Sequence, residues 1–256
     1  MSNLLEGKLV LVLGIANRWS LAYACAQAYA REGATLVLTY LGERQKDSIA
    51  ELSKGLNVAA IVPCDVTKDE ELAGLTEALL ALDRPLHAVM HSLAFANRED
   101  LSRPFVETPR AGFLLAQDVS AYSLVAVARA IVPAMTEGGS LSTLTYLGST
   151  RVMPNYNVMG VAKASLEATM RYLSSDLGPQ KIRVNAISAG PVKTASARAV
   201  KDFSSILDTV PQRAPLRRNT DPAEVADAAV FLASDLGRGV TGNILFVDAG
   251  MQVMAY

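Results

Sequence analysis

A tyrosine and a lysine seven residues apart form the pair in this sequence best suited to chemistry. Tyr156 and Lys163 stand in PNYNVMGVAK, residues 154–163, where the residue pattern predicts a helix. Because a helix advances about 100° per residue, positions seven apart differ by roughly 20° and share a face. A phenol hydroxyl supplies a hydrogen-bond donor and an ammonium supplies positive charge. We therefore expect both side chains to point into one cleft.

Three neighbouring residues bear on this pair. Met159 lies four residues before Lys163, where the commoner short-chain dehydrogenases have the tyrosine of a Y-x-x-x-K pair. Tyr146 ends the predicted strand before the helix, and its position fits either a catalytic contribution or packing on the cofactor region. Asn155 is expected to cap the helix, whose positive end would then lie near developing negative charge.

Seven short apolar runs alternate with segments of helical pattern. Runs that are apolar on both alternating faces suit the strands of a parallel sheet covered on both sides. We therefore predict an α/β fold in one domain spanning residues 1–256, a Rossmann-like doubly wound seven-stranded parallel sheet with helices on both faces. Ligands of such sheets bind at the carboxyl ends of the strands. The predicted strands are residues 8–14, 35–40, 57–63, 86–92, 140–146, 182–188 and 243–250.

The amino-acid composition limits which kinds of ligand the protein is expected to bind and where in the cell it is expected to be. The chain has 256 residues, about half of them hydrophobic, and a net charge of −1 without charged blocks, so no nucleic-acid surface is indicated. The two cysteines, Cys25 and Cys64, form no ligand-spaced cluster, so neither structural zinc nor a disulfide scaffold is expected. Without a cleavable leader or an apolar run of about 18 residues, we expect a cytoplasmic protein that does not span a membrane.

The first predicted strand ends where a dinucleotide fold would bind pyrophosphate. Gly14 is followed by IANRWS, so the usual G-x-G-x-x-G is absent and the segment fits either a phosphate site or an ordinary turn. After the third strand, Asp65 and Val66 fit an adenine contact, although Asp65 could instead cap the next helix. Directly at the end of the second strand, Tyr40-Leu41-Gly42 offers no acidic side chain to bind a ribose 2′-hydroxyl. Arg44 or Lys46 fits either a contact with a 2′-phosphate or the solvated first turn of a helix.

The fourth and sixth predicted strands end in further candidate residues. His91 has no second ligand at a sensible spacing, so we expect a histidine satisfied by backbone hydrogen bonds and no metal site. After the sixth strand comes AGPVKTAS, residues 189–196, in which Pro191 fixes a turn. Beyond it, apolar residues at helical spacing fit either a helix packed on the core or a lid at about 190–220 over an apolar substrate: Ala199, Phe203, Ile206, Leu207 and Val210.

Several motifs together resemble the short-chain-dehydrogenase-type enoyl-acyl carrier protein reductases of bacterial fatty acid synthesis. The resemblance runs over nearly the whole chain and is more specific than any one glycine pattern. It includes His91-Ser92-Leu93 where the commoner short-chain enzymes have N-A-G. Its other parts are Gly14 with Ser20-Leu21, Asp65-Val66, TYLGSTRVMPNYNVMGVAKASLEA (145–168), VNAISAGPVKT (184–194) and VDAG (247–250).

The resemblance implies reduction of a trans-2-enoyl-acyl carrier protein thioester, with hydride from NADH or NADPH going to C3, as the last step of fatty acid elongation. By the family pattern Tyr156 is the donor to the thioester oxygen and Lys163 holds the nicotinamide ribose, with Tyr146 at the active site. The implied cofactor-binding residues are Gly14, Ser20, Leu21, Leu41, Asp65, Val66, Ser92, Leu93, Lys163, Val192, Lys193, Thr194, Ala195 and Ser196. The implied substrate-binding residues are Ala96, Tyr146, Tyr156, Met159, Phe203 and Ile206.

The seven-residue spacing then has a candidate physical reason. Conjugate reduction separates the hydride acceptor from the oxygen by two more bonds than carbonyl reduction does, and three residues along a helix shift a side chain's origin by roughly 4.5 Å. NADH is favoured over NADPH because Leu41 and Gly42 supply no basic pair after the second strand. The resemblance also implies a homotetramer and an acidic carrier protein as partner. A short-chain ketoreductase and a nonenzymatic dinucleotide sensor are the alternatives.

Overall fold

The computed structural model describes residues 3–194, 201 and 203–255, and it confirms the predicted sheet. Seven strands pair in parallel in the order β3-β2-β1-β4-β5-β6-β7. Their bounds are β1 Leu9–Leu13, β2 Thr35–Tyr40, β3 Val58–Pro63, β4 Leu86–His91, β5 Gly139–Thr145, β6 Ile182–Ala189 and β7 Ile244–Val247. Each strand lies within one of the predicted apolar runs or within one residue of it.

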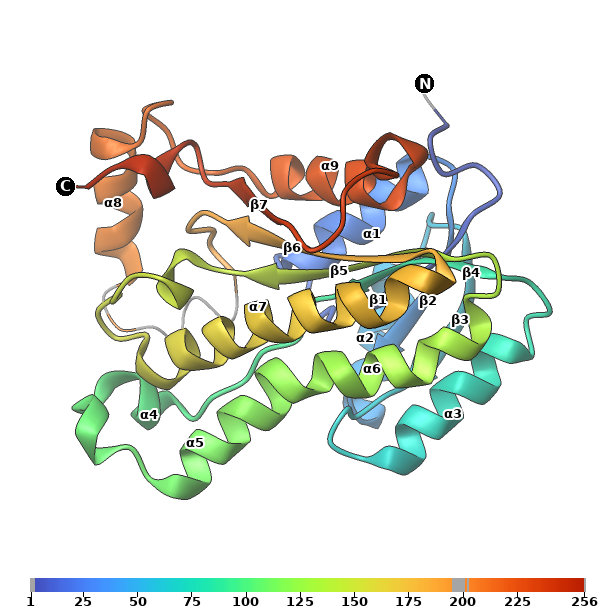
Figure 1. The fold of residues 1–256 in the computed structure, drawn as a ribbon, viewed down its shortest axis with the longest axis horizontal. Coiled ribbons are helices and arrows are strands. Elements are labelled where there is room, and N and C mark those ends of the chain that lie inside the picture. Colours follow the sequence, from blue (N-terminus) through green and yellow to red (C-terminus); the bar gives the residue numbers. More distant parts are fainter. Residues whose placement is uncertain (1–2, 195–200, 202, 256) are drawn as a thin grey trace.

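Helices cover both faces of this sheet (Figure 1). In the described residues the α-helices are α1 Leu21–Arg31, α2 Glu43–Leu52, α3 Asp69–Leu80, α4 Arg98–Ser102, α5 Arg110–Gln117, α6 Ser123–Ile131, α7 Asn157–Leu177, α8 Phe203–Arg213 and α9 Pro222–Ala233. Helices α1 and α9 lie on one side of the sheet, whereas α3, α6 and α7 lie on the other. Helix α8 stands at the end of the molecule where α7 begins.

Alternation along the strands explains why both faces are covered. In β1, Leu9, Leu11 and Leu13 belong to the core cluster under α3, α6 and α7, while Val10 and Val12 belong to the cluster under α1 and α9. Successive side chains of a strand point to opposite faces, so a strand buried on both sides must be apolar throughout. All five residues of β1 are fully buried as a result.

The order of the strands locates the crevice. The chain passes from β1 outward to β2 and β3, and then returns to β4 on the other side of β1. Two connections therefore leave the sheet in opposite directions after β1 and β4, which is the topological switch point where open α/β sheets bind ligands. Gly14 follows β1 and Ser92 follows β4, so both lie at this point.

The long helical run over residues 110–134 is interrupted. Helices α5 and α6 are joined by a π-helical turn, Asp118–Tyr122, and a short 3₁₀ turn, Val132–Ala134, ends the run. Residues 110–134 are long and apolar enough to cross a membrane by length and composition alone. Half of their most apolar window is buried inside the protein, and core helices of soluble proteins pass the same test.

Candidate active site

A pocket of about 430 Å³ opens beside the carboxyl ends of β5 and β6. Its lining is mostly apolar, and an apolar pocket with a few convergent polar groups is the usual form of a small-molecule site. All six predicted substrate-binding residues line it, together with Leu21, Val192 and Thr194 from the predicted cofactor set. The structure thus brings these side chains together, and their roles stay predictions. The remaining lining residues are Ala94, Phe95, Leu101, Thr145, Met153, Pro154, Ala189, Gly190 and Pro191.

Two tyrosines face each other in this pocket. The rings of Tyr146 and Tyr156 meet edge to face, with centroids 5.1 Å apart and planes at 70°. Such T-shaped pairs are favoured by the ring quadrupole. Within the part of the chain that the structure describes, neither hydroxyl has a hydrogen-bond partner. Both hydroxyls can therefore serve a bound molecule.

Burial keeps these tyrosines protonated. It raises the pKa of Tyr146 to about 12, and it raises the pKa of Tyr156 well above its ordinary value, with smaller contributions from Tyr146 and Glu167. A phenol that stays neutral across the physiological range is a hydrogen-bond donor, not a base. The pair is thus suited to stabilising negative charge on an oxygen.

A glycine makes room for the Tyr156 ring. Residues 147–149 form a 3₁₀ turn after β5, and a Cβ on Gly148 would lie 2.6 Å from Cδ1 of Tyr156. Gly160 faces the same turn, since a Cβ there would lie 2.8 Å from the Gly148 carbonyl oxygen. Side chains at these two positions would push the turn away from α7, so the glycines allow Tyr156 to approach Tyr146.

The start of α7 differs from the prediction in one respect. Tyr156 itself occupies the N-cap position, and its carbonyl oxygen accepts from Met159 N at 2.9 Å. Asn155 was expected to cap this helix, and that prediction is wrong. It adopts φ 60°, outside the extended backbone of a cap residue, and its amide donates to the Lys201 carbonyl oxygen at 3.1 Å. Tyr156 therefore lies at the N-cap of α7, seven residues or about two helical turns before Lys163.

Lys163 lies behind the pocket lining. It is 6% exposed, and its Nζ donates to the Leu144 carbonyl oxygen at 2.8 Å. Burial lowers the pKa of Lys163 to about 8, and Glu167 opposes that shift. The ammonium has three N–H donors, so the bond to Leu144 leaves two for other acceptors.

The turn after β1 is built for close backbone approach. Gly14 adopts φ 94°, and a Cβ there would lie 2.1 Å from the Ser92 carbonyl oxygen and 3.2 Å from Cδ2 of Leu93. Only glycine fits this position. Ser20 caps α1 by accepting from Tyr23 N at 3.3 Å, so this N-terminus is ordered beside the switch point. The glycine cradle and the N-terminus of α1 fit a dinucleotide pyrophosphate.

The residues predicted to hold the adenosine end are arranged locally. Asp65 was offered as a possible cap of the next helix, but Lys68 occupies that position. The Asp65 carboxylate instead accepts from the backbone N and the hydroxyl of Thr67, at 3.1 and 2.7 Å. Val66 is buried beside it, whereas Leu41 is 56% exposed after β2. These three residues surround the carboxyl ends of β2 and β3.

The two cations after β2 lie on the exposed first turn of α2. Lys46 Nζ is 3.5 Å from the Glu43 carboxylate and 5.9 Å from the centroid of the Tyr40 ring. A lysine held by an acid and a ring is a weaker candidate for a 2′-phosphate than a free one. Arg44 is exposed on the same turn.

The segment after β6 is described only in part. Val192 is buried and its carbonyl oxygen accepts from Thr194 N at 2.8 Å, while Lys193 is exposed. Ala195 and Ser196 lie outside the described residues, as does Ala199. Beyond the gap, α8 directs Phe203 and Ile206 to the pocket and buries Leu207 and Val210.

Both ring nitrogens of His91 have hydrogen-bond partners, as predicted, but the partners are side chains and not the backbone. Its ring nitrogens lie 2.9 Å from Oγ1 of Thr143 and 2.9 Å from Oγ of Ser123. Because the Ser123 hydroxyl donates to the Val119 carbonyl oxygen, it accepts from Nε2–H of His91. Burial lowers the pKa of His91 to about 3, so the ring is neutral. Among residues 3–194 and the later described segments, no cluster of three metal-ligating side chains occurs.

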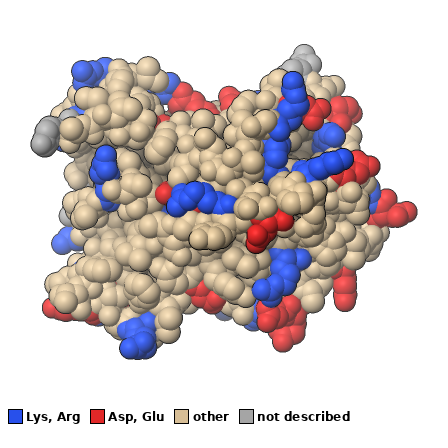
Figure 2. All heavy atoms as spheres, viewed as in Figure 1, with Lys and Arg blue, Asp and Glu red and all other residues tan. Residues whose placement is uncertain are grey.

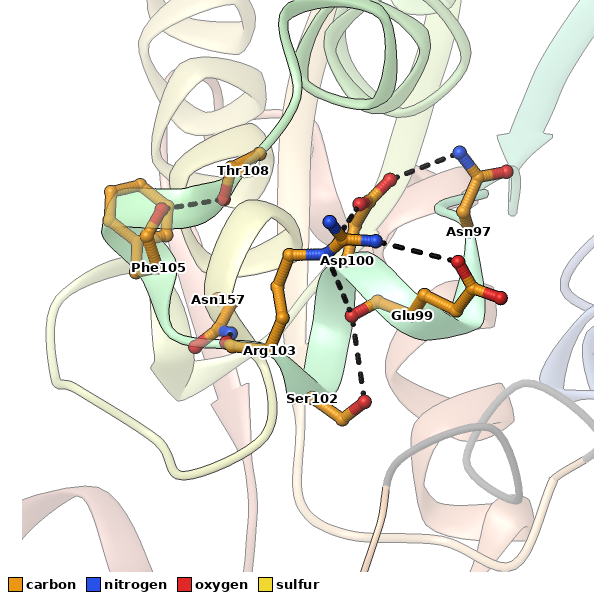
Figure 3. A network of polar contacts seen from close by, with 8 residues as sticks. All are labelled: Asn97, Glu99, Asp100, Ser102, Arg103, Phe105, Thr108 and Asn157. Atoms are coloured by element: carbon orange, nitrogen blue, oxygen red, sulfur yellow. Dashed lines mark hydrogen bonds and ion pairs between the residues drawn. The ribbon is translucent and has the colours of Figure 1, made fainter.

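A polar network joins one wall of the pocket to the start of α7 (Figure 3). Asp100 is 2% exposed, accepts from the Asn97 amide at 3.0 Å and lies 3.2 Å from Nε of Arg103. The amide of Asn157 donates to the Arg103 carbonyl oxygen at 2.6 Å. Leu101, between these residues, lines the pocket. The network therefore fixes α4 relative to the helix that follows Tyr156.

Sequence reasoning missed two residues that stand beside the predicted site. Thr145 lines the pocket, and its hydroxyl donates to Oε1 of Glu167 at 2.6 Å. Glu167 is 5% exposed and lies four residues after Lys163 on α7. An acidic residue in an otherwise apolar helix face, one turn after a candidate lysine, is the signal that could have identified it.

Known proteins match this chain over nearly its whole length. A family model described as Enoyl-(Acyl carrier protein) reductase matches residues 14–252. The enoyl-[acyl-carrier-protein] reductase [NADH] FabI of Bacillus cereus is 54% identical over 253 residues, 98% of this chain and 99% of the relative. The NADPH-named FabI of Staphylococcus aureus is 48% identical over 98% of each chain.

A solved structure has the same fold throughout. The crystal structure of the Bacillus cereus enoyl-acyl carrier protein reductase with NADP⁺ and indole naphthyridinone superposes with a TM-score of 0.97 and 53% identity, covering 100% of both chains. Fold, pocket and full-length sequence similarity agree with the motifs found in the sequence. The chain belongs to the enoyl-acyl carrier protein reductase family of short-chain dehydrogenase type.

Proposed function

We propose that this protein reduces the trans-2 double bond of enoyl-acyl carrier protein thioesters, using NADH or NADPH, as the last step of the fatty acid elongation cycle. The observation that carries the proposal is the pair of tyrosines, Tyr146 and Tyr156, whose ring centroids lie 5.1 Å apart in an apolar pocket of about 430 Å³. The pair occurs in a chain of this family. Bound reduced nicotinamide supplies a hydride to C3, and a proton from solvent completes the product at C2.

Tyr156 is the proposed donor to the thioester oxygen. Reduction at C3 moves negative charge to that oxygen, and a preorganised donor in a water-poor pocket stabilises such charge strongly. The raised pKa of Tyr156 keeps its proton in place for this hydrogen bond. Tyr146 is proposed to assist, because its ring packs against that of Tyr156 and its pKa is raised to about 12.

Met159 supports reduction of a carbon–carbon bond over reduction of a carbonyl. It lines the pocket at the position where the commoner short-chain enzymes have their tyrosine. A thioether offers no hydrogen for an oxyanion. The donor instead comes from Tyr156, at the start of α7, which suits an oxygen two bonds farther from the hydride acceptor.

The proposed cofactor site follows the switch point of the sheet. Gly14, Ser20 and Leu21 would hold the pyrophosphate, while Ser92, Leu93 and Lys163 would hold the nicotinamide ribose. The remaining proposed cofactor contacts are Leu41, Asp65, Val66, Val192, Lys193, Thr194, Ala195 and Ser196. NADH is the favoured cofactor because no basic pair follows β2 and because Lys46 is held by Glu43 and Tyr40. Parallel initial-rate titrations with NADH and NADPH test this preference.

The segment from about 190 to 220 is the proposed substrate lid within a single-domain chain of residues 1–256. Phe203 and Ile206 of α8 line the pocket together with Ala96 and Met159, which form an apolar surface for an acyl chain. Leu207 and Val210 lie on the same face of α8 as Phe203 and Ile206 and are buried, so this face packs on the protein as well as lining the pocket. Such a helix can cover a substrate while remaining packed on the protein.

The protein is further proposed to be a homotetramer that works in the cytoplasm. Its proposed partner is the carrier protein that bears the substrate, and neither nucleic acid nor a membrane is a proposed partner. The part of the surface where α5 and the first half of α7 lie carries few Lys, Arg, Asp or Glu side chains (Figure 2). Leu114, Tyr122 and Tyr172 are 58%, 47% and 77% exposed on α5, the π-helical turn after it and α7. Exposed apolar side chains of this kind favour subunit contact. Sedimentation at working concentration should give a tetramer, and a monomer would contradict it.

Substrate pairs test the proposed reaction. Crotonyl thioester should oxidise the reduced cofactor, and acetoacetyl thioester should leave it unchanged. Oxidation with the keto substrate alone would identify a ketoreductase. Cofactor binding without turnover of either substrate would favour a dinucleotide sensor.

A further inference from the structure

Two hydrogen bonds tie α7 to the carboxyl end of β5. Lys163 Nζ donates to the Leu144 carbonyl oxygen at 2.8 Å, and the Thr145 hydroxyl donates to Oε1 of Glu167 at 2.6 Å. Lys163 and Glu167 are four residues apart and therefore share a helix face. The consecutive strand residues Leu144 and Thr145 immediately precede Tyr146. The two bonds thus set the distance between the elements that carry Tyr146, Tyr156 and Lys163.

Lys163 and Glu167 are both ionisable residues with buried side chains. Lys163 is 6% exposed and Glu167 is 5% exposed. A buried charge is costly unless an opposite charge or hydrogen bonds compensate it. In the described residues the two side chains form no direct ion pair within 4.0 Å, so Glu167 acts on Lys163 through charge while leaving ammonium N–H donors for a ligand. The short O–H···O distance from Thr145 is typical of an ionised acceptor.

The other titratable groups around Lys163 carry no charge at neutral pH. His91, at the end of β4, has a pKa lowered to about 3 by burial and by Lys163. Tyr146, after β5, and Tyr156, before α7, have raised pKa values and remain neutral phenols. Among the described residues that face the ammonium, Glu167 is therefore the one source of negative charge.

We propose that Glu167 is a positioning residue of the active site, whose carboxylate keeps the buried Lys163 protonated and, through Thr145, holds the strand end that carries Tyr146. This inference rests on the proposed ribose role of Lys163. Loss of the carboxylate charge leaves desolvation of the ammonium unopposed, so Lys163 loses its proton at lower pH. Loss of the Thr145 hydroxyl leaves the charge in place but unties the strand end.

Variants of Glu167 test the role of its charge, and variants of Thr145 test the hydrogen bond that holds the strand end. Cofactor affinity is measured by calorimetric titration with the tighter-binding of NADH and NADPH from pH 6 to 10, which needs no enoyl substrate. Wild-type cofactor affinity should weaken as pH rises above about 8, the pKa of Lys163. The pH at which the affinity begins to weaken is called the break. In Glu167→Gln the break should move to lower pH by about 0.5–1 unit. The exposed Glu77 on α3 supplies the matched control, and Glu77→Gln should keep the wild-type break.

Thr145→Val and Thr145→Ser test the second half of the proposal. Thr145→Val should keep the wild-type break in affinity but lower kcat with crotonyl thioester about tenfold, as expected for a lost positioning bond. Thr145→Ser should restore kcat, because it retains the hydroxyl. Equal kcat in Thr145→Val and wild type would overturn the tethering role.

An unchanged break in Glu167→Gln, or an affinity loss of equal size at every pH, would overturn the charge role. If Glu167→Gln fails to fold, judged by circular dichroism, Glu167→Asp carries the test. It keeps the charge and should keep the break, so a shifted break in Glu167→Asp would equally overturn the proposal. Because the affinity measurements use no enoyl substrate, they remain decisive even if the proposed reaction fails.

Discussion

The Tyr146 and Tyr156 rings meet edge to face with their centroids 5.1 Å apart, although nine residues, including a 3₁₀ turn, separate them in the chain. Tyr146 follows a strand and Tyr156 caps a helix, so each ring is held by a different regular element. Sites mounted on strands and helices keep their geometry better than sites on loops. Two phenols fixed in one apolar pocket can present a donor to a substrate oxygen with little reorganisation.

Removal of the Tyr156 hydroxyl should reduce turnover far more than cofactor binding. In Tyr156→Phe the ring and its contact with Tyr146 remain, so the loss is confined to one donor. We expect kcat to fall by about 10²–10³, the range for deleting a donor to a developing oxyanion. Cofactor affinity should stay within about twofold. Steady-state rates and calorimetric titration check both values, and an unchanged kcat would remove Tyr156 from the mechanism.

Gly148 should be needed for activity because of the space it leaves. A Cβ in Gly148→Ala would lie 2.6 Å from Cδ1 of Tyr156, and the ring or the turn must move. We expect kcat to fall about tenfold or more, since small displacements of a catalytic group are costly. Gly74→Ala is the matched control, because a Cβ at Gly74 meets no atom within 4 Å. Equal activity of both variants would show that Tyr156 tolerates displacement.

Gly14→Ala should abolish tight cofactor binding. The position has φ 94°, and the added Cβ would lie 2.1 Å from the Ser92 carbonyl oxygen, so the turn after β1 must open. Trp19, the single tryptophan, is 60% exposed on this turn and offers a fluorescence signal for bound cofactor. We expect at least about a tenfold rise in Kd. Wild-type affinity in a folded Gly14→Ala protein would exclude this turn from the cofactor site.

His91 should make the fold sensitive to mild acid. Because burial lowers its folded pKa from 6.5 to about 3, its contribution to stability is fully present above about pH 6.5 and is lost as pH falls toward 3. Between pH 6.5 and pH 5 the expected loss is about 2 kcal/mol. Urea unfolding of wild type and His91→Asn at pH 7 and pH 5 checks this. The wild type should lose more stability on acidification, and equal losses would contradict the prediction.

The sheet could be predicted from sequence because burial on both faces leaves a direct trace. A run such as residues 9–13, LVLVL, is apolar at every position, so it fits few structures other than a strand buried on both faces. The position of a helix cap has no comparable signal in the sequence. Asn155 has the right side chain for an N-cap, but the backbone there adopts φ 60° and the cap falls on Tyr156. Residue type alone does not determine which of two adjacent residues is the cap.

Polar partners distant in sequence could not be predicted. His91 bonds Ser123 and Thr143, which are 32 and 52 residues away, and Thr145 bonds Glu167 at a separation of 22. A hydrogen-bonded pair of this kind depends on how strands and helices pack, whereas composition and periodicity report only local preference. The Tyr156 and Lys163 pair was accessible because both residues belong to one helical segment.

Isotope transfer tests the central claim most directly. The protein is incubated with reduced cofactor deuterated at the transferred position of C4 and with crotonyl thioester, and the product is analysed by mass spectrometry and NMR. Conjugate reduction predicts butyryl thioester with one deuterium at C3, and Tyr156→Phe should form it about 10²–10³ times more slowly. A hydroxylated product, deuterium at another carbon, or no product despite cofactor binding would contradict the proposed reaction.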